Sequence, residues 1–266
     1  MADTKALRNR IKSVDSTLHL TKAMGLVASS KIRRANDAMI KGREYSKAVD
    51  DAVRILASCK ECEKSPYLAK RNTGRTRLIV IAGDRGMAGG YNANVFRLIR
   101  DLDFEAEILP IGKRACDRYG KGISSSEYFD YKEACELSTK LCEDFAAGEF
   151  DRLGIVYTRY VSMMTQTATL SFVLPIEPQK AVSVGIIFEP DERTVLDAAV
   201  PEYLAGKIVR CVRESFASEV AARRMAMDSA GKNAQEMIDR LGLEYNRARQ
   251  SAITQEITEI VAGSGN

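Results

Sequence analysis

The C-terminal stretch EYLAGKIVRCVRESFASEVAARRMAMDSAGKNAQEMIDRLGLEYNRARQSAITQEITEIV, residues 202–261, decides the fold of this chain. It contains no proline, and apolar or small side chains recur through it at steps of mostly three and four residues. A pattern of this period that continues so far is typical of a coiled-coil helix. At about 1.5 Å per residue the helix would be roughly 90 Å long, so the stretch predicts a rod along which another helix packs. The seam positions are Val209, Val212, Phe216, Val220, Met227, Ala230, Ala234, Met237, Leu241, Tyr245, Ala248 and Ala252.

Residues 3–57 carry a similar pattern, and no proline precedes Pro66. A short amphipathic stretch would indicate a helix lying on a globular core, but a pattern of this length favours a second rod. Two rods at opposite ends of one chain predict an antiparallel coiled coil, whose small seam residues allow the helices to approach closely. The seam positions are Thr4, Leu7, Ile11, Val14, Leu18, Thr21, Gly25, Ala28, Ile32, Ala35, Met39, Val49, Val53 and Leu56.

Between the rods the period of the apolar pattern changes. After a polar connector at residues 58–76, the apolar run at 77–82 is typical of a buried parallel strand. The alternation of strands and helices that follows predicts a small Rossmann-like α/β domain at residues 76–190, and residues 1–58 and 202–266 form the coiled-coil shaft. Further strands are predicted at 107–111, 127–129, 153–161, 165–175 and 182–188, and helices at 92–102, 113–119 and 132–147.

Composition and charge exclude several classes of protein. The N-terminus enters a charged helical pattern rather than a signal peptide, no run of eighteen apolar residues predicts a membrane span, and the six cysteines are expected to be reduced. Residues 1–47 contain eleven lysines and arginines against four acidic residues. This basic helix is compatible with an acidic protein surface or with nucleic acid, although His19 and Tyr45 are its only candidate stacking groups.

The motif GDRGMAGG, residues 83–90, lies between a predicted strand and a predicted helix, where backbone N–H groups can hold a phosphate. It matches neither G-x-G-x-x-G nor G-x-x-x-x-G-K-[ST], so a tight turn that presents Asp84 and Arg85 to a neighbour is favoured. Cys59 and Cys62 form a C-x-x-C pair, but two further zinc ligands are missing. We therefore predict no catalytic residues, no cofactor and no metal site.

The end of the C-terminal rod, ARQSAITQEITEIV at residues 248–261, stays amphipathic to its last turn. Its apolar residues Ile253, Ile257, Ile260 and Val261 alternate with polar ones. A free helix end normally frays. An end with this much apolar surface predicts a socket in another protein.

Three stretches resemble the gamma subunit of F-type ATP synthases: SSKIRRANDAM (29–39), AGDRGMAGGYN (82–92) and ASEVAARRMAMDSAGKNAQEMIDRLGLEYNRARQSAITQEITEIV (217–261). With the order of domains, the resemblance covers essentially the whole chain. It implies a non-catalytic central stalk, a rotor that couples ion translocation to ATP synthesis or hydrolysis. The implied partners are the surrounding alpha and beta subunits, which carry the catalytic sites, the epsilon subunit and the ring of c subunits. The resemblance implies a protein that is peripheral to the cytoplasmic face of a bacterial cell membrane. It implies no nucleic-acid partner.

The resemblance also implies roles for single residues. Lys22, Met24 and Arg223 match positions that contact an acidic lever of the beta subunits. Glu189 matches a contact to the c ring. The positions that match the end held by the alpha-beta ring are Arg249, Gln250, Thr254 and Glu256. The cysteine-bearing insertion of the chloroplast type is missing, so thiol regulation is not implied.

Two other functions stay open at this point. The first is a small α/β nucleotide-binding enzyme whose helical arms dimerise it, and calorimetry with ATP tests it. The second is a coiled-coil adaptor that binds nucleic acid, and salt-dependent binding to a generic duplex tests it.

Overall fold

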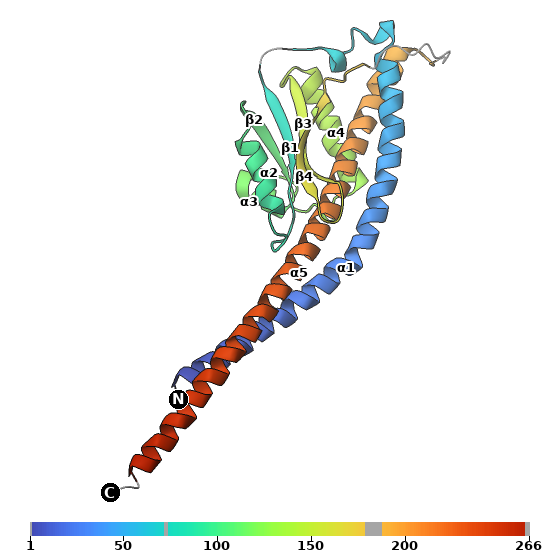
Figure 1. Cartoon of the computed structure of the whole chain (residues 1–266). Helices are drawn as coiled ribbons and strands as arrows, with labels where there is room; N and C mark the ends of the chain where they lie inside the picture. Colours follow the sequence, from blue (N-terminus) through green and yellow to red (C-terminus); the bar gives the residue numbers. More distant parts are fainter. Residues whose placement is uncertain (1, 72–73, 179–187, 264–266) are drawn as a thin grey trace. The chain divides into compact units, whose positions relative to one another are not determined.

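The computed structural model describes residues 2–71, 74–178 and 188–263. Contacts divide the chain into two compact units: unit 1, Met1–Ser29 with Arg223–Asn266, and unit 2, Ser30–Ala222. The two long helices, α1 (Ala2–Ala57) and α5 (Glu192–Gly263), contribute to both units, whereas the strands among the described residues all lie in unit 2 (Figure 1). Within the described residues, no helix combines the length and the apolar character that crossing a membrane requires.

Unit 2 contains a four-stranded sheet in the order β2-β1-β3-β4. Strand β1 (Thr76–Ile81) pairs in parallel with β2 (Ala106–Ile111) and β3 (Arg152–Tyr160), and β3 pairs antiparallel with β4 (Gln166–Leu174). The helices between the parallel strands are α2 (Tyr91–Arg100), α3 (Lys113–Tyr119) and α4 (Tyr131–Ala146). The predicted small α/β domain, with its final hairpin, is confirmed.

Strand β1 shows how helices cover both faces of this sheet, because its side chains alternate between them. Leu78 and Val80 share an apolar cluster with residues of α2 and α3. Ile79 and Ile81 face a larger cluster, to which α4 and both long helices contribute. All four side chains are completely buried, which explains why the strand is a continuous apolar run. The larger cluster includes Val53, Leu56, Leu141, Phe145, Leu196, Leu204 and Ile208.

Helix α5 begins at Glu192 rather than at residue 202 and contains Pro201. Proline inside a helix removes one hydrogen bond and crowds the preceding turn, which is why the sequence placed the helix start after it. The neighbouring Leu196, Val200 and Leu204 are all fully buried in the core of unit 2. Their apolar burial, worth about 1.5–3 kcal/mol per large side chain, offsets the cost of the proline.

The contact-based units differ from the sequence-based division into shaft and lobe. The later part of α1 and the earlier part of α5 belong to unit 2, because Val53, Ile208 and Val212 lie in the same apolar cluster as strand β1. Residues 58–76, predicted as a connector, contain two short 3₁₀ helices, η1 (Lys60–Cys62) and η2 (Pro66–Leu68).

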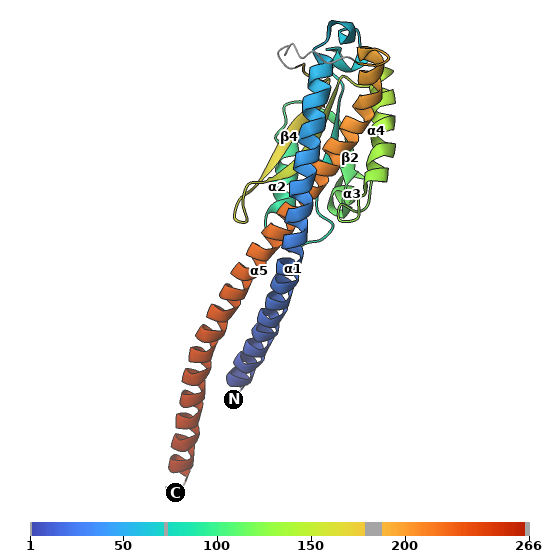
Figure 2. The same cartoon turned by 90° about the vertical axis from the view of Figure 1, so that its right-hand side faces the viewer.

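In unit 1 the beginning of α1 lies beside the part of α5 that follows Arg223, antiparallel to it, and the last turns of α5 extend beyond the start of α1 (Figures 1 and 2). A Cβ atom built on Gly25 would lie 3.7 Å from Cβ of Met227, so the helices touch where the seam residues are small. The buried residues of this pair among those that the structure describes are seam positions that the sequence identified: Leu18, Thr21, Gly25, Ala28, Met227, Ala234 and Leu241. The predicted fold class, an antiparallel helix pair with an inserted α/β domain, is confirmed.

One predicted strand is wrong and another cannot be judged. Residues 127–129 form no strand, because the N–H groups of Ser126 and Glu127 donate to the carboxylate of Asp84 instead of to a neighbouring strand. The parallel bridge at this edge of the sheet is made earlier, by Ile123 with Ile111. The strand predicted at 182–188 lies almost entirely outside the described residues.

Candidate partner-binding surfaces

A basic groove of about 470 Å³ lies between the two helices of unit 1. Its wall contains the cations Lys22, Arg224 and Lys232. The only carboxylate among the lining residues, Asp228, forms an ion pair with Lys232 at 3.0 Å. The groove therefore carries a positive excess that complements an acidic partner. Of the predicted contact residues, Lys22 is exposed in this groove, whereas Met24 and Arg223 are half-buried and do not line it.

Unit 1 also exposes large apolar side chains outside the seam. Leu26 is 68% exposed and Leu243 is 63% exposed, although a helix pair in water would normally place polar residues at such positions. Large apolar side chains that gather on one exposed surface are typical of a site that another protein covers. The complete set in the described part of unit 1 is Leu20, Leu26, Val27, Leu243, Ile253, Ile257, Ile260 and Val261.

The C-terminal end of α5 remains helical to Gly263. All four residues predicted for this end, Arg249, Gln250, Thr254 and Glu256, are exposed. The Thr254 hydroxyl donates to the carbonyl of Gln250, 3.0 Å away and one turn earlier. The last turns of α5 thus expose both polar side chains and isoleucines. A socket that binds them would need both polar and apolar contacts.

In unit 2 the Asp84 carboxylate of the glycine-rich loop is directed into the protein. It accepts hydrogen bonds from the backbone N–H groups of Lys113 (3.1 Å), Ser126 (2.8 Å) and Glu127 (3.0 Å) and from the Ser125 hydroxyl (2.7 Å). Burial alone would raise the pKa of Asp84, but these hydrogen bonds outweigh it and lower the pKa. Both oxygens are thus engaged within the chain, and a contact of Asp84 with a partner stays a prediction.

This arrangement occupies the groups that a phosphate would need. The first N–H of α3 donates to Asp84, and the N–H of Gly83 donates to the side-chain oxygen of Asn92 at 2.9 Å. A Cβ atom on Gly83 would meet the carboxylate carbon of the buried Glu219 at 2.7 Å. Two carboxylates beside the loop repel an anion, so the interpretation of the motif as a tight turn is the better one.

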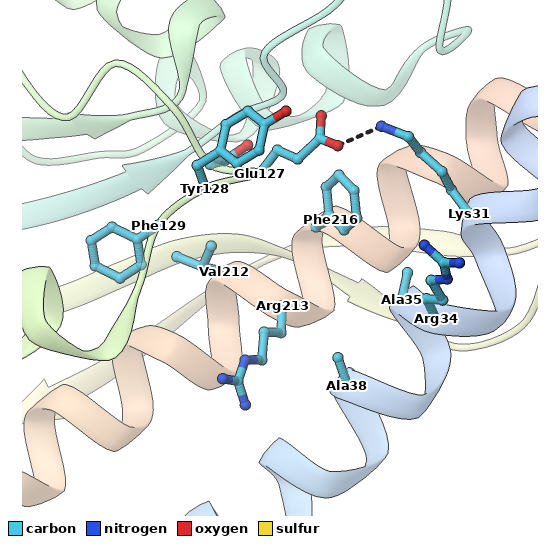
Figure 3. A pocket seen from close by; sticks show the side chains of 11 residues that line it. Lys31, Arg34, Ala35, Ala38, Glu127, Tyr128, Phe129, Val212, Arg213 and Phe216 are labelled. Atoms are coloured by element: carbon cyan, nitrogen blue, oxygen red, sulfur yellow. Dashed lines mark hydrogen bonds and ion pairs between the residues drawn. The ribbon is translucent and has the colours of Figure 1, made fainter.

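Next to this loop, Glu127 joins two cations. Its carboxylate forms an ion pair with Lys31 of α1 and lies 3.7 Å from a guanidinium nitrogen of the exposed Arg85. Figure 3 shows the Lys31–Glu127 pair at the rim of a cavity of about 350 Å³, with Phe216 of α5 on its apolar side. Arg85 is therefore positioned at the surface by the same segment that Asp84 organises.

The remaining candidates form no site in the described residues. Glu189 is exposed, at the edge of the described part of the chain. Cys62 is completely buried, and burial raises the pKa of its thiol to about 11, which makes it unreactive. In the part of the chain that the structure describes, no group of histidines, cysteines and carboxylates has the arrangement of a metal site.

Sequence reasoning missed the role of residues 125–127 as partners of Asp84. The stretch Ser124-Ser125-Ser126-Glu127 is rich in donors, but it lies about forty residues from Asp84 in sequence. Contact between two loops at the same edge of a sheet can be predicted from sequence only when the strands that flank both loops are placed correctly.

Comparison with known proteins gives the family. A family model described as ATP synthase matches residues 3–265. The ATP synthase gamma chain of Ruminococcus albus is 40% identical over 284 aligned positions, which cover 100% of this chain and 99% of that protein. The chain belongs to the ATP synthase gamma chain family. The gamma chain of Desulforamulus reducens is 38% identical, with 99% of each chain covered. The resemblance stated from the sequence is confirmed. The gamma chain of an ATP synthase is a stalk subunit rather than the catalytic subunit.

Solved structures agree in fold. A chain of the Euglena gracilis mitochondrial ATP synthase, in an assembly of OSCP, F1 and c-ring, superimposes with a TM-score of 0.69 at 18% identity and covers 99% of this chain and 94% of its own. A chain from the central stalk and c-ring of the Tetrahymena thermophila enzyme gives a TM-score of 0.62 at 21% identity, covering 79% of this chain and 99% of its own. Neither alternative function, the nucleotide-binding enzyme or the nucleic-acid adaptor, is favoured by these relatives.

Proposed function

We propose that this gamma chain is the rotary central stalk of an F-type ATP synthase, coupling the flow of protons or sodium ions through a membrane sector to ATP synthesis or hydrolysis. The observation that carries the proposal is the exposed apolar surface of unit 1, because family membership and that surface together require a partner along the helix pair. The catalytic sites lie on beta subunits, and the chain works at the cytoplasmic face of a bacterial membrane, peripheral to it.

The proposed partners divide between the two units. Alpha and beta subunits surround unit 1, and the epsilon subunit and the c ring contact unit 2. Lys22, Met24 and Arg223 contact the acidic lever of the beta subunits, and the basic groove that contains Lys22 supports this assignment. Glu189 contacts the c ring, and Arg85, which is exposed beside Glu127, contacts a neighbouring subunit.

The C-terminal end of α5 occupies a socket in the alpha-beta ring. Arg249, Gln250, Thr254 and Glu256 supply its polar contacts, and the exposed isoleucines of the same turns supply the apolar ones. The predicted division into a shaft, 1–58 with 202–266, and a lobe, 76–190, describes these roles: the shaft turns inside the ring and the lobe remains outside it.

A rotor must change partners at every step without being trapped by any one of them. Exposed ion pairs contribute only about 0–1 kcal/mol each, so contacts by residues such as Lys22 can break and form again with the next beta subunit. Differential contacts of this kind shift each catalytic site between conformations as the shaft turns.

The test of this proposal is Ile257→Asp in the assembled ATP synthase. Ile257 is 56% exposed at the end of α5, and a carboxylate in an apolar socket is costly, so ion-driven ATP synthesis falls or assembly fails. The matched control is Ile40→Asp, since Ile40 is 51% exposed on the part of α1 in unit 2. Ion-driven synthesis that is equal in both variants and the unsubstituted complex would refute the socket, and ATP turnover by the isolated chain would refute the non-catalytic role.

A further inference from the structure

A cavity of about 540 Å³ in unit 2 is separate from every surface described above. It lies between α1, α5 and the end of β3, and charged side chains form most of its wall. The cations outnumber the carboxylates, five to two: Arg43, Lys47, Arg159, Lys207 and Arg210 against Asp50 and Glu214.

Both carboxylates are already paired inside the wall. Asp50 accepts from Lys207 at 2.9 Å, and the almost fully buried Glu214 accepts from Arg43 at 2.6 Å and from the backbone N–H of Tyr160 at 3.2 Å. Three cations remain without a carboxylate partner among the described residues, namely Lys47, Arg159 and Arg210. The cavity therefore carries an uncompensated positive charge at its wall.

Arg210 has one side-chain donor without an acceptor. Its Nε atom is buried and has no hydrogen-bond partner, and a buried donor in that state costs free energy. Burial alone would lower the pKa of Arg210, but Cys211, Tyr157 and Glu214 raise it, so the guanidinium keeps its charge. The neighbouring Lys207 has a lowered pKa because of burial and, in part, because Arg210 is close. An anion in the cavity would offset the positive charge of both side chains.

We propose that this cavity binds a phosphate-type oxyanion, either free or carried by a small phosphorylated molecule. A tetrahedral oxyanion presents several acceptors at once, and arginine guanidinium groups bind it through paired N–H donors. The hydroxyl-bearing residues Ser46 and Tyr157 line the same wall and add donors. The volume lies within the range of about 300–1,000 Å³ that is typical of small-molecule pockets, so it admits more than a single phosphate.

The site is independent of the rotary function proposed above, because it uses none of the residues assigned to partner contacts. It is also distinct from the glycine-rich loop, where carboxylates occupy the anion position. An oxyanion there would join α1 to α5 and to strand β3 through Lys47, Arg210 and Arg159.

The experiment is titration calorimetry of the full-length chain with inorganic phosphate, pyrophosphate and glycerol phosphate, at ionic strength held constant with chloride. The test variant is Lys47→Ala/Arg159→Ala, since both side chains are exposed and their truncation leaves the buried pairs intact. The matched control is Lys121→Ala/Lys140→Ala, which removes two exposed cations from elsewhere in unit 2. Circular dichroism checks that both variants keep the fold.

We expect saturable binding with one site per chain, weakened about tenfold or more in the test variant and unchanged in the control; tenfold corresponds to about 1.4 kcal/mol. Binding of free phosphate identifies the ion itself as the ligand, and binding of only the ester or pyrophosphate identifies a phosphorylated molecule. Equal weakening in both variants would mean non-specific charge attraction and overturn the proposal. Absence of binding by all three probes would overturn it as well, while leaving the rotary function untouched.

Discussion

Replacing Asp84 with asparagine tests whether one carboxylate organises the edge of the sheet in unit 2. In the folded protein this carboxylate accepts hydrogen bonds from three backbone N–H groups and two serine hydroxyls, at 2.7–3.2 Å. Asparagine keeps one acceptor oxygen but replaces the other with an NH₂ group, which faces N–H donors instead of accepting from them. At least one donor then loses its partner.

The expected loss of stability follows from these bonds. Hydrogen bonds to charged groups contribute about 1.5–3 kcal/mol, and Asp84 is only half-buried, so water replaces part of what is lost. We expect Asp84→Asn to lower the free energy of unfolding by about 2 kcal/mol at neutral pH. Because the folded-state pKa of Asp84 lies below its ordinary value, this stabilisation is present above the unfolded-state pKa and is lost as the pH falls through the folded-state pKa.

The assay is urea unfolding of the full-length chain, followed by circular dichroism at neutral pH and at several acidic pH values. Asp84→Asn should destabilise the protein at neutral pH, and the difference from the unsubstituted chain should shrink as the acidity increases. Asp103→Asn is the matched control, because Asp103 is exposed in the same unit. An Asp84→Asn midpoint equal to that of the control at every pH would refute the role of Asp84 as an organising acceptor.

Two further predictions concern packing and reactivity. A Cβ on Gly154 would lie 2.7 Å from Leu78 Cδ2 and 2.8 Å from Leu170 Cδ1, so Gly154→Ala should lower the free energy of unfolding in urea by about 1–3 kcal/mol. Gly242 has open space around its Cβ, so Gly242→Ala should stabilise helix α5 by about 0.5–1 kcal/mol. Cys62, with a thiol pKa of about 11 against an ordinary 9.0, should be alkylated far more slowly at pH 8 than the half-buried Cys135, as measured by mass spectrometry; equal rates would contradict its burial.

The fold was largely predictable because its main signals are periodic. The three-four spacing of positions such as Leu18, Thr21 and Leu241 identifies a buried seam without any knowledge of the partner helix. The run at β1 likewise identifies a strand that is covered on both faces. The start of α5 was missed because local propensity at Pro201 opposes a helix, and only the tertiary burial of Leu196 and Leu204 overrides it.

The candidate surfaces were predictable to a smaller extent. The exposed end of α5 follows from its amphipathic pattern, since exposure of Ile257 and Ile260 requires only that no helix faces them. The inward orientation of Asp84 and the charged cavity around Arg210 depend on segments that are distant in sequence and meet only in three dimensions. The sequence shows which side chains are charged, but only the folded structure shows which of them form ion pairs and hydrogen bonds with one another.

The exposed leucines and isoleucines of unit 1 have a consequence for how the cell makes this protein. A chain that is synthesised in excess of its partners leaves those side chains in water, where they adhere to one another or to other exposed apolar surfaces. Copies without a partner are therefore prone to aggregate. Production of the subunit must keep pace with the supply of the chains that cover it, and an imbalance in gene dosage should appear first as insoluble protein.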